Sequence, residues 1–228
     1  MLNVAVIGMG WWGKTLVTAI GKSSKLRVVK GVKRNPATEA EFAREHKFEI
    51  ISDYSGVLKD PTIQGVVLCT PHTLHTEQII AAAKAGKHIF CEKPLSLTHT
   101  DVVCALDTVN KNKVTLAVGH ERRFESTMEE ISRIVASGEM GTQMHVEANF
   151  SHDIFASVDA DNWRGSTEEA PAAGMTGMGV HLTDLFISML GPVEAVAAQT
   201  AKRVLDLPTG DVVTVQFKFQ SGSTGFIG

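Results

Sequence analysis

Short apolar runs rich in β-branched residues alternate with longer amphipathic segments along the first 120 residues. The apolar runs predict strands at 3–7, 27–32, 65–69, 88–91 and 115–119. The amphipathic segments predict helices at 12–22, 37–46, 74–85 and 98–112, with Gly86 as a stop signal after the third. Repeated strand, helix and strand require parallel pairing, so we expect an α/β fold with a doubly wound sheet. Ligands of such sheets bind at the carboxyl ends of the strands.

The pattern changes after residue 121, so we expect one domain over 1–121 and a second over 122–228. Helices are predicted at 126–137 and 180–190, and strands at 143–150, 193–201, 212–219 and from 224 onwards. A polar stretch at 151–174 predicts a long functional loop. The sequence stops at Gly228 within a predicted sheet, which leaves a strand edge unpaired. We expect either another subunit to supply the remaining strands or the chain to be part of a longer protein.

Composition narrows the class of partner. The 228 residues include 22 Lys and Arg against 25 Asp and Glu, a net charge of −3, and the pI is about 6.3. This balance offers no basic field for nucleic acid. Even the apolar stretch at 175–192 is interrupted by His181 and Asp184, and the N-terminus has no signal-peptide pattern, so we expect a cytoplasmic protein without a membrane partner. A small molecule is the expected partner.

The three cysteines, Cys69, Cys91 and Cys104, are widely spaced and form neither a disulfide framework nor a metal motif. Cys69 and Cys91 end predicted strands, where cysteine commonly serves as a small apolar residue. His72 and His75 lie near Cys69 in sequence, but they complete no closed ligand set. We therefore expect reduced thiols and no metal.

The segment Gly8-Met9-Gly10-Trp11-Trp12-Gly13 follows the first predicted strand and opens the first predicted helix. This G-x-G-x-x-G spacing permits a tight turn, close approach of backbone to a pyrophosphate, and close packing of helix on strand. Trp11 and Trp12 could cover the cofactor or pack in a core. The loop predicts dinucleotide binding by Gly8, Gly10 and Gly13.

Lys33 and Arg34 stand at the end of the second strand, where NAD-binding proteins commonly carry an acidic residue for the ribose 2′-hydroxyl. Two cations suit a 2′-phosphate, so the pair predicts NADP(H) as the preferred cofactor, with NAD(H) as the alternative. A solvated Lys-Arg pair without a ligand is the other interpretation.

Three further segments complete a family pattern. They are Thr70-Pro71-His72-Thr73-Leu74-His75, Cys91-Glu92-Lys93-Pro94 and Gly179-Val180-His181-Leu182-Thr183-Asp184. Together with the glycine loop, they resemble the glucose-fructose oxidoreductase, inositol dehydrogenase and rhizopine catabolism (Gfo/Idh/MocA) family of NAD(P)-dependent oxidoreductases. The resemblance covers nearly the whole chain. It implies an N-terminal Rossmann domain and a C-terminal α+β domain with a mostly antiparallel sheet, which carries the substrate pocket and often the oligomer interface. Because family members usually run about a hundred residues longer, the chain is expected to be C-terminally incomplete.

The resemblance points to Lys93 as the first catalytic candidate. Hydride transfer to or from a carbonyl carbon needs a proton donor or acceptor at the oxygen, and a lysine near a cationic nicotinamide can be tuned toward neutrality. The family pattern also implies a cis peptide bond between Lys93 and Pro94. His181 is the second catalytic candidate, and Asp184, three residues later on the same helical face, could orient its imidazole. The sequence departs from the family at Gly177, where an Asp commonly serves in the proton relay.

Other positions carry roles that the resemblance implies. We expect Thr70, Pro71, His75 and Glu92 to border the cofactor with Lys93. Trp163 and Arg164 match a recurrent pair of the substrate domain and, with His181 and Asp184, are candidates for substrate binding, although a salt bridge would equally explain Arg164.

The leading hypothesis is an oxidoreductase that transfers a hydride between NADP(H), or NAD(H), and a polyol, sugar or related hydroxy or carbonyl compound. A non-catalytic dinucleotide-binding sensor or regulatory protein is the alternative, favoured by Gly177. A third activity that occurs in the family is glycoside cleavage through transient oxidation. We also expect a homo-oligomer formed through the C-terminal sheet.

Overall fold

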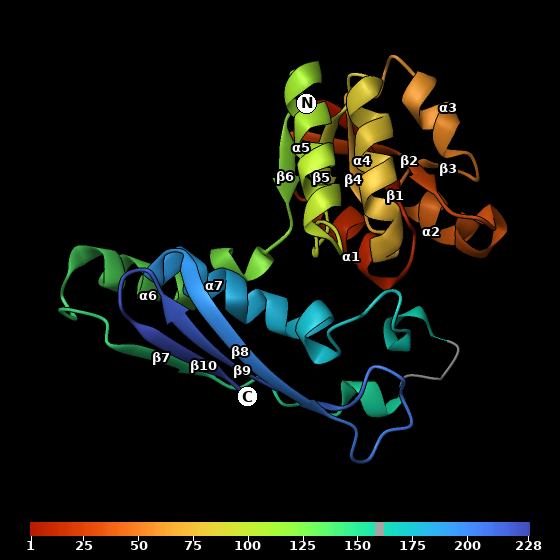
Figure 1. The fold of residues 1–228 in the computed structure, drawn as a ribbon. Helices are drawn as coiled ribbons and strands as arrows, with labels where there is room; N and C mark the ends of the chain where they lie inside the picture. Colours follow the sequence, from red (N-terminus) through yellow and green to blue (C-terminus); the bar gives the residue numbers. More distant parts are fainter. Residues whose placement is uncertain (158–161) are drawn as a thin grey trace. The chain divides into compact units, whose positions relative to one another are not determined.

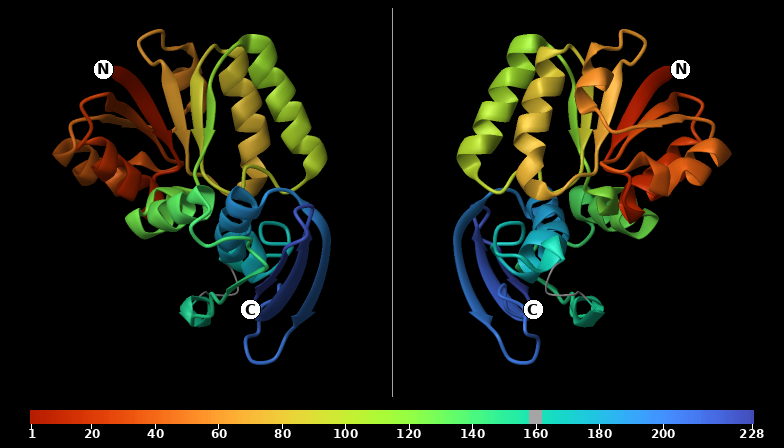
Figure 2. Two further views of the ribbon diagram at one scale, coloured as in Figure 1. Left: turned by 90° about the vertical axis from the view of Figure 1, so that its left-hand side faces the viewer. Right: turned by 90° about the vertical axis from the view of Figure 1, so that its right-hand side faces the viewer.

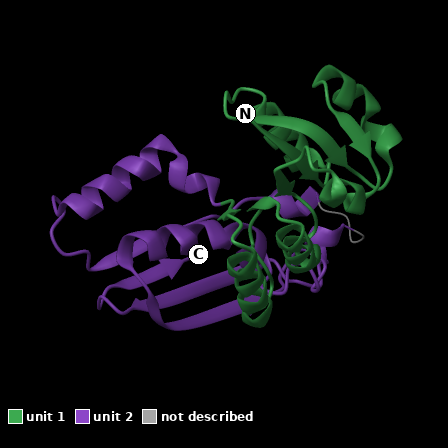
Figure 3. Cartoon of the chain, turned by 90° about the horizontal axis from the view of Figure 1, so that it is seen from above, with its two compact units in different colours: residues 1–119 green, residues 120–228 purple. Residues whose placement is uncertain are grey.

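The computed structural model of the protein describes residues 1–157 and 162–228. The chain forms two compact units, Met1–Gly119 and His120–Gly228, which Figure 3 colours separately. The predicted polar loop at 151–174 includes residues 158–161, which lie outside the described residues.

The first unit contains one parallel sheet (Figure 1). Its strands are β1 (Leu2–Ile7), β2 (Leu26–Val32), β3 (Glu49–Ile51), β4 (Gly65–Leu68), β5 (His88–Cys91) and β6 (Leu116–Val118). They are ordered β3-β2-β1-β4-β5-β6, so the strand order reverses between β1 and β4. This is the doubly wound Rossmann arrangement, and it confirms the predicted fold of the first part.

Helices connect these strands and cover both faces of the sheet. They are α1 (Trp11–Ile20), α2 (Ala40–Glu45), α3 (Tyr54–Lys59), α4 (His75–Lys84) and α5 (His99–Asn112), with short 3₁₀ turns η1 (Pro36–Glu39) and η2 (His72–Leu74). The α4 and α5 helices lie side by side (Figure 2). The periodicity did not predict β3, which has three residues, or α3, which has six residues and contains Gly56, a poor helix former.

The strands divide the core of the first unit into two layers because their side chains alternate between faces. On β1, Ala5 and Ile7 join one cluster with α3, α4 and α5, whereas Val4 and Val6 join the other with α1 and α2. Burial on both faces explains why these strands read as continuous apolar runs rather than as alternating ones.

The second unit packs one long helix on a four-stranded sheet. Its elements are α6 (Ser126–Ser137), β7 (His145–Ala148), α7 (Val180–Leu190), β8 (Val193–Ala201), β9 (Val212–Phe219) and β10 (Thr224–Ile227). Strand order is β7-β10-β9-β8; β8 and β10 pair antiparallel with β9, and β10 pairs parallel with β7. The prediction of a mostly antiparallel sheet is therefore confirmed.

One face of this sheet forms the core of the second unit. Phe186 and Leu190 of α7 pack on Val215, Phe217 and other apolar residues of the sheet. Residues Glu194–Ala201 of β8 are exposed. In Figure 1 the sheet lies along α7 on one side and is open on the other. Across the described residues, no helix is both long and apolar enough to cross a membrane.

Candidate functional site

The glycine loop begins directly after β1 and leads into α1. Gly8 has a φ of +95°, and a Cβ at this position would lie 2.5 Å from the Cys69 carbonyl oxygen. A Cβ at Gly13 would lie 2.1 Å from the Gly8 carbonyl oxygen. Both positions therefore require glycine, the first for the turn beside β4 and the second for contact between helix and loop.

Gly10 is different because it is not crowded by protein atoms. It precedes α1 with extended backbone, and a Cβ built there would meet no heavy atom within 4 Å. A glycine that protein packing does not demand, at the N-terminus of a helix, fits the close approach of a pyrophosphate to the backbone. The loop thus fits a dinucleotide.

The two tryptophans of the loop lie in the first turn of α1, with ring centroids 5.3 Å apart. Trp11 is 73% exposed. The Trp12 indole nitrogen is buried and has no hydrogen-bond partner among the described residues. A buried N–H without an acceptor is costly, so this donor is a good candidate for bonding to a bound cofactor.

The end of β2 carries the predicted cations Lys33 and Arg34. The Lys33 ammonium donates a short hydrogen bond to the Glu39 carboxylate, and the Lys14 ammonium lies 3.2 Å from the other oxygen of the same carboxylate. The hydrogen bond from Lys33 holds the pKa of the buried Glu39 below its usual value, and Lys14 adds to this effect. Arg34 is exposed, and no ion pair or hydrogen bond of its side chain is found in the described part of the chain.

His75 joins the loops that follow β4 and β5. It is fully buried, with Nε2 3.0 Å from the Thr70 carbonyl oxygen and Nδ1 2.9 Å from the Pro94 carbonyl oxygen. The Thr70 hydroxyl donates to the Gln78 side chain at 2.6 Å. His75 therefore holds two candidate cofactor-binding segments together, and its predicted direct contact with cofactor stays a prediction.

Glu92 and Lys93 follow β5 at the same edge of the sheet. The Glu92 carboxylate is buried, accepts a 3.3 Å hydrogen bond from the Lys93 backbone N–H, and occupies the space beside Gly119. The Lys93–Pro94 peptide bond is cis, as the family resemblance implied. Lys93 itself is half-buried.

Burial of the thiols of Cys69 and Cys91, at the ends of β4 and β5, raises the pKa of both, and the nearby Glu92 charge adds to the effect. Cys91 is fully buried, in agreement with its predicted role as a small apolar residue. Both thiols are therefore unsuited to act as nucleophiles at neutral pH. Among the described residues there is also no group of three His, Cys, Asp or Glu side chains that could hold a metal ion.

In the second unit, His181 lies near the start of α7 and is 4% exposed. Its Nε2 is 3.9 Å from a carboxylate oxygen of Glu121. Asp184 accepts two 2.5 Å hydrogen bonds from the Arg123 guanidinium, and its Oδ2 lies 3.5 Å from His120 Nδ1. The structure therefore gives Asp184 a tight arginine partner, and its predicted role in orienting His181 stays a prediction.

Gly177 lies in a turn of π-helix, Met175–Gly179, that leads into α7. A Cβ at Gly177 would meet no heavy atom within 4 Å. The position that commonly carries an Asp in the resembled family is thus open here, and no packing requirement explains the glycine. π-helical turns are frequently found at functional sites.

Trp163 and Arg164 form a 3₁₀ turn, Trp163–Gly165. The Arg164 guanidinium lies 4.2 Å from the centroid of the Trp163 ring, which is cation–π geometry. The Asn162 side chain accepts a 3.0 Å hydrogen bond from the Arg164 N–H and begins the turn. The pair is thus preorganised, and its predicted binding of substrate stays a prediction.

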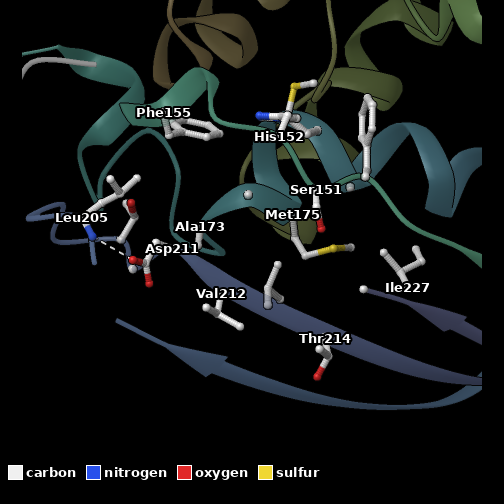
Figure 4. Close-up of a pocket in the computed structure, with 18 residues that line it drawn as sticks. Ser151, His152, Phe155, Ala173, Met175, Leu205, Asp211, Val212, Thr214 and Ile227 are labelled. Carbon is white, nitrogen blue, oxygen red and sulfur yellow. Dashed lines mark hydrogen bonds between the residues drawn. The ribbon is translucent and has the colours of Figure 1, made fainter. Parts of the chain in front are cut away.

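A pocket of about 270 Å³ lies within the second unit (Figure 4). Its walls come from the segment after β7, the π-helical turn and the residues just before it, the connection between β8 and β9, the start of β9 and the end of β10. The labelled residues Phe155, Met175 and Val212 represent its apolar lining, and Ser151 and Thr214 are among its polar groups. The pocket is near the lower limit for small-molecule sites and would take a compact, partly apolar group.

The Asp211 carboxylate stands at this pocket but is committed to the backbone. It accepts hydrogen bonds from the N–H groups of Arg203, Val204 and Leu205, at 2.7, 2.6 and 2.8 Å. The bonds from Leu205, Val204 and Arg203 lower the pKa of Asp211. Its charge therefore stabilises the connection between β8 and β9.

The first unit brings the predicted cofactor residues to one edge of its sheet. Gly8, Lys33, Thr70 and Glu92 follow β1, β2, β4 and β5, all parallel strands, at their carboxyl ends. Sequence reasoning missed Lys14 and Glu39 beside Lys33, and Glu121 and His120 beside the residues of α7. Lys14 was detectable because it follows the last glycine of the loop directly, whereas Glu39 lies in no motif.

Comparison with known proteins extends these observations. Residues 2–120 match a protein family described as "Oxidoreductase family, NAD-binding Rossmann fold", and residues 128–228 match the "GFO/IDH/MocA C-terminal domain". The levoglucosan dehydrogenase of Pseudarthrobacter phenanthrenivorans is 30% identical over 217 residues, 91% of this chain and 56% of that protein. The myo-inositol 2-dehydrogenase of Thermotoga maritima is 34% identical over 176 residues, 75% of this chain and 51% of that protein.

Among solved structures, an oxidoreductase from Desulfitobacterium hafniense superimposes with a TM-score of 0.94 at 26% identity. The match covers 100% of this chain and 66% of that one. The chain spans about half the length of the two dehydrogenases.

Proposed function

The chain belongs to the Gfo/Idh/MocA family of oxidoreductases with an NAD-binding Rossmann fold, and from this premise we propose that it transfers a hydride between a nicotinamide cofactor and a polyol, a sugar or a related hydroxy or carbonyl compound. The observation that carries the proposal is the position of Glu92-Lys93-Pro94 after β5, at the sheet edge where the glycine loop follows β1. The relatives named for levoglucosan and myo-inositol support this substrate class.

The bound nicotinamide would supply the hydride acceptor or donor. Lys93 would hold or release the proton at the substrate oxygen, because oxidation of an alcohol frees one proton and reduction of a carbonyl consumes one. His181 would assist as the second acid–base group. Gly8, Gly10 and Gly13 would accommodate the pyrophosphate, with Trp12 as a further donor, and Thr70, Pro71 and Glu92 would border the cofactor.

For the cofactor, we propose NADP(H) as the preferred form and NAD(H) as an accepted one. Lys33 and Arg34 at the end of β2 support this order, because two cations can bind a 2′-phosphate whereas a 2′-hydroxyl gains little from them. Arg34 is exposed and so accessible to a ligand. Trp163, Arg164 and Asp184 are the proposed substrate contacts in the second unit.

The test compares Lys93→Met with Lys84→Met. Lys84 is an exposed lysine at the end of α4, so its substitution removes the same charge outside the proposed site. With a substrate identified by absorbance at 340 nm, Lys93→Met is expected to lower kcat at least about 100-fold, the lower end for a lost acid–base group. Calorimetric cofactor affinity should change less than about threefold in both variants. Full turnover by Lys93→Met would contradict the catalytic assignment.

A second candidate function is cofactor binding without turnover. Gly177 favours it, because glycine cannot carry the proton that an Asp would carry in the resembled family, and nothing in the local packing requires glycine. Tight binding of NADPH with no change at 340 nm across polyols, sugars and their keto forms would support this function over the first.

We also propose self-association through the open face of the C-terminal sheet. Glu194–Ala201 of β8 are exposed. Ala197 lies directly opposite the exposed Gln216 of β9, so both side chains are on the open face, away from α7. Ala197→Glu should lower the mass measured by light scattering, because it places a charge on the proposed interface. Val204→Glu, at an 86% exposed position outside β8, is the matched control. An unchanged mass for Ala197→Glu would exclude this surface.

A further inference from the structure

The residue of interest is Glu39, which no motif assigns. It ends η1, and its side chain is 10% exposed, an unusual position for a carboxylate. It makes no capping hydrogen bond to α2. Its two oxygens instead face two ammonium groups, Lys33 on one and Lys14 on the other. Helix capping therefore does not explain why a carboxylate is buried at this position. Its partners are the two lysines beside the proposed ribose site.

Glu39 of η1, Lys33 after β2 and Lys14 of α1 meet where the adenosine end of a dinucleotide is expected. Lys33 follows β2, and Lys14 is in the first turn of α1, directly after the glycine loop. In a doubly wound sheet, the ribose of a dinucleotide lies by the end of the second strand. The Lys14 ammonium also lies 5.7 Å from the ring centroid of Phe42 on α2, which restrains it further.

We propose that Glu39 is a specificity-determining residue: its carboxylate offsets the charge of Lys33 and Lys14, and so weakens the preference for a 2′-phosphorylated cofactor and keeps NAD(H) acceptable. The inference rests on the proposed cofactor site. Lys14, Lys33 and Arg34 carry three positive charges, and Glu39 removes one. A 2′-phosphate bound to the Lys33 ammonium would lie within about 6 Å of Glu39, two hydrogen-bond lengths away. This is shorter than the screening length of about 8 Å at physiological salt, so the two anions repel. A 2′-hydroxyl is uncharged and meets no such repulsion.

Glu39→Gln separates charge from shape. Glutamine keeps the size of the side chain and an oxygen that accepts a hydrogen bond from lysine, but it removes the negative charge. Glu41→Gln is the matched control, because Glu41 lies two residues away on α2 with a side chain 90% exposed. Melting temperatures of both variants establish that they fold.

The probes are adenosine 2′,5′-bisphosphate and AMP, which differ only by the 2′-phosphate and need no catalysis. We expect Glu39→Gln to raise the ratio of the AMP Kd to the bisphosphate Kd about tenfold over the original chain, equivalent to about 1.4 kcal/mol. The gain should come from the bisphosphate, with the AMP affinity nearly constant. Glu41→Gln should leave the ratio within about twofold, because its carboxylate is exposed to solvent and contacts neither Lys33 nor Lys14 among the ion pairs of the described residues. An unchanged or lower ratio in Glu39→Gln overturns the inference.

Lys33→Met tests the underlying cofactor assignment separately. If the original chain prefers the bisphosphate and Lys33→Met loses that preference, the assignment of the 2′-phosphate site stands, whatever Glu39→Gln does. If Lys33→Met leaves the ratio unchanged, the assignment fails independently of Glu39. Binding of neither nucleotide by the folded original chain overturns both.

Discussion

The same one-methyl change at Gly10 and at Gly13 should have opposite consequences. A Cβ at Gly10 meets no heavy atom within 4 Å, and its extended backbone suits alanine. Gly10→Ala should therefore change the free energy of unfolding by less than about 1 kcal/mol. The expected cost is limited to the lower preference for alanine than for glycine at the residue that precedes a helix. A Cβ at Gly13 would lie 2.1 Å from the Gly8 carbonyl oxygen. Backbone must move to admit it, so Gly13→Ala should cost about 3 kcal/mol, near the upper end for overpacking.

For cofactor binding, the variant with nearly unchanged stability, Gly10→Ala, should show a large loss of affinity. The methyl group of Gly10→Ala would occupy the space proposed for the pyrophosphate, so we expect a loss of about 100-fold in NADPH affinity, or about 2.7 kcal/mol. At an NADPH concentration of 100 times the original Kd, the ligand stabilises the original chain by about 2.7 kcal/mol. The same concentration would stabilise Gly10→Ala by only about 0.4 kcal/mol, because it then equals the Kd.

The assay is thermal unfolding of both variants with and without NADPH, together with calorimetric titration. Gly13→Ala should melt about 10 °C lower without ligand, whereas Gly10→Ala should melt within a few degrees of the original chain. If Gly10→Ala retains the full NADPH-induced shift, the pyrophosphate does not approach Gly10. A Gly13→Ala variant with an unchanged melting temperature would contradict the crowding between loop and helix.

Three further changes have expected outcomes. Lys87→Met should lower the free energy of unfolding by about 2–4 kcal/mol in urea titrations, because the buried ammonium donates to the Asp60 and Ile63 carbonyl oxygens at 2.7 and 2.8 Å; an unchanged urea midpoint would refute this. Hydrogen bonds from Thr62, and an ion pair with a neighbouring lysine, lower the pKa of Asp60 to about 2. This carboxylate therefore stabilises the fold above its unfolded pKa of about 3.9, and the contribution is lost as pH falls toward about 2, so Asp60→Asn should flatten the acid limb of stability measured from pH 2 to 5. An identical acid limb would count against it. Gly177→Asp should fold with a melting temperature within about 4 °C of the original, since its Cβ meets no atom within 4 Å, and should raise kcat on a polyol substrate if a proton carrier is limiting; loss of folding would contradict the open space.

The local parts of this protein follow from sequence because their causes are local. Apolar runs and glycine positions lie within a few residues of one another, so β1, the turn at Gly8 and α1 could be predicted from a single segment. The cis Lys93–Pro94 bond, in contrast, was expected only because the resemblance to the family implied it, and it is cis. The succession of strands and helices determined the parallel sheet, because a helix between two strands carries the chain back to the end where the first strand began, so the next strand runs in the same direction. The sequence did not predict β3, a three-residue strand at the edge of the sheet, or α3, a six-residue helix that contains Gly56.

Partner choice among polar side chains was decided by the tertiary structure. Glu39 meets Lys14 from 25 positions away, and Arg123 bonds to Asp184 across 61 positions. His75 occupies the gap between the Thr70 and Pro94 carbonyls, a role that its place in the motif did not indicate. Such contacts depend on where packing brings distant elements and on which charge must be compensated once it is removed from water. The sequence therefore determined which residue types lie at the carboxyl edge of the sheet, and the tertiary structure decided which of them form ion pairs and hydrogen bonds with one another.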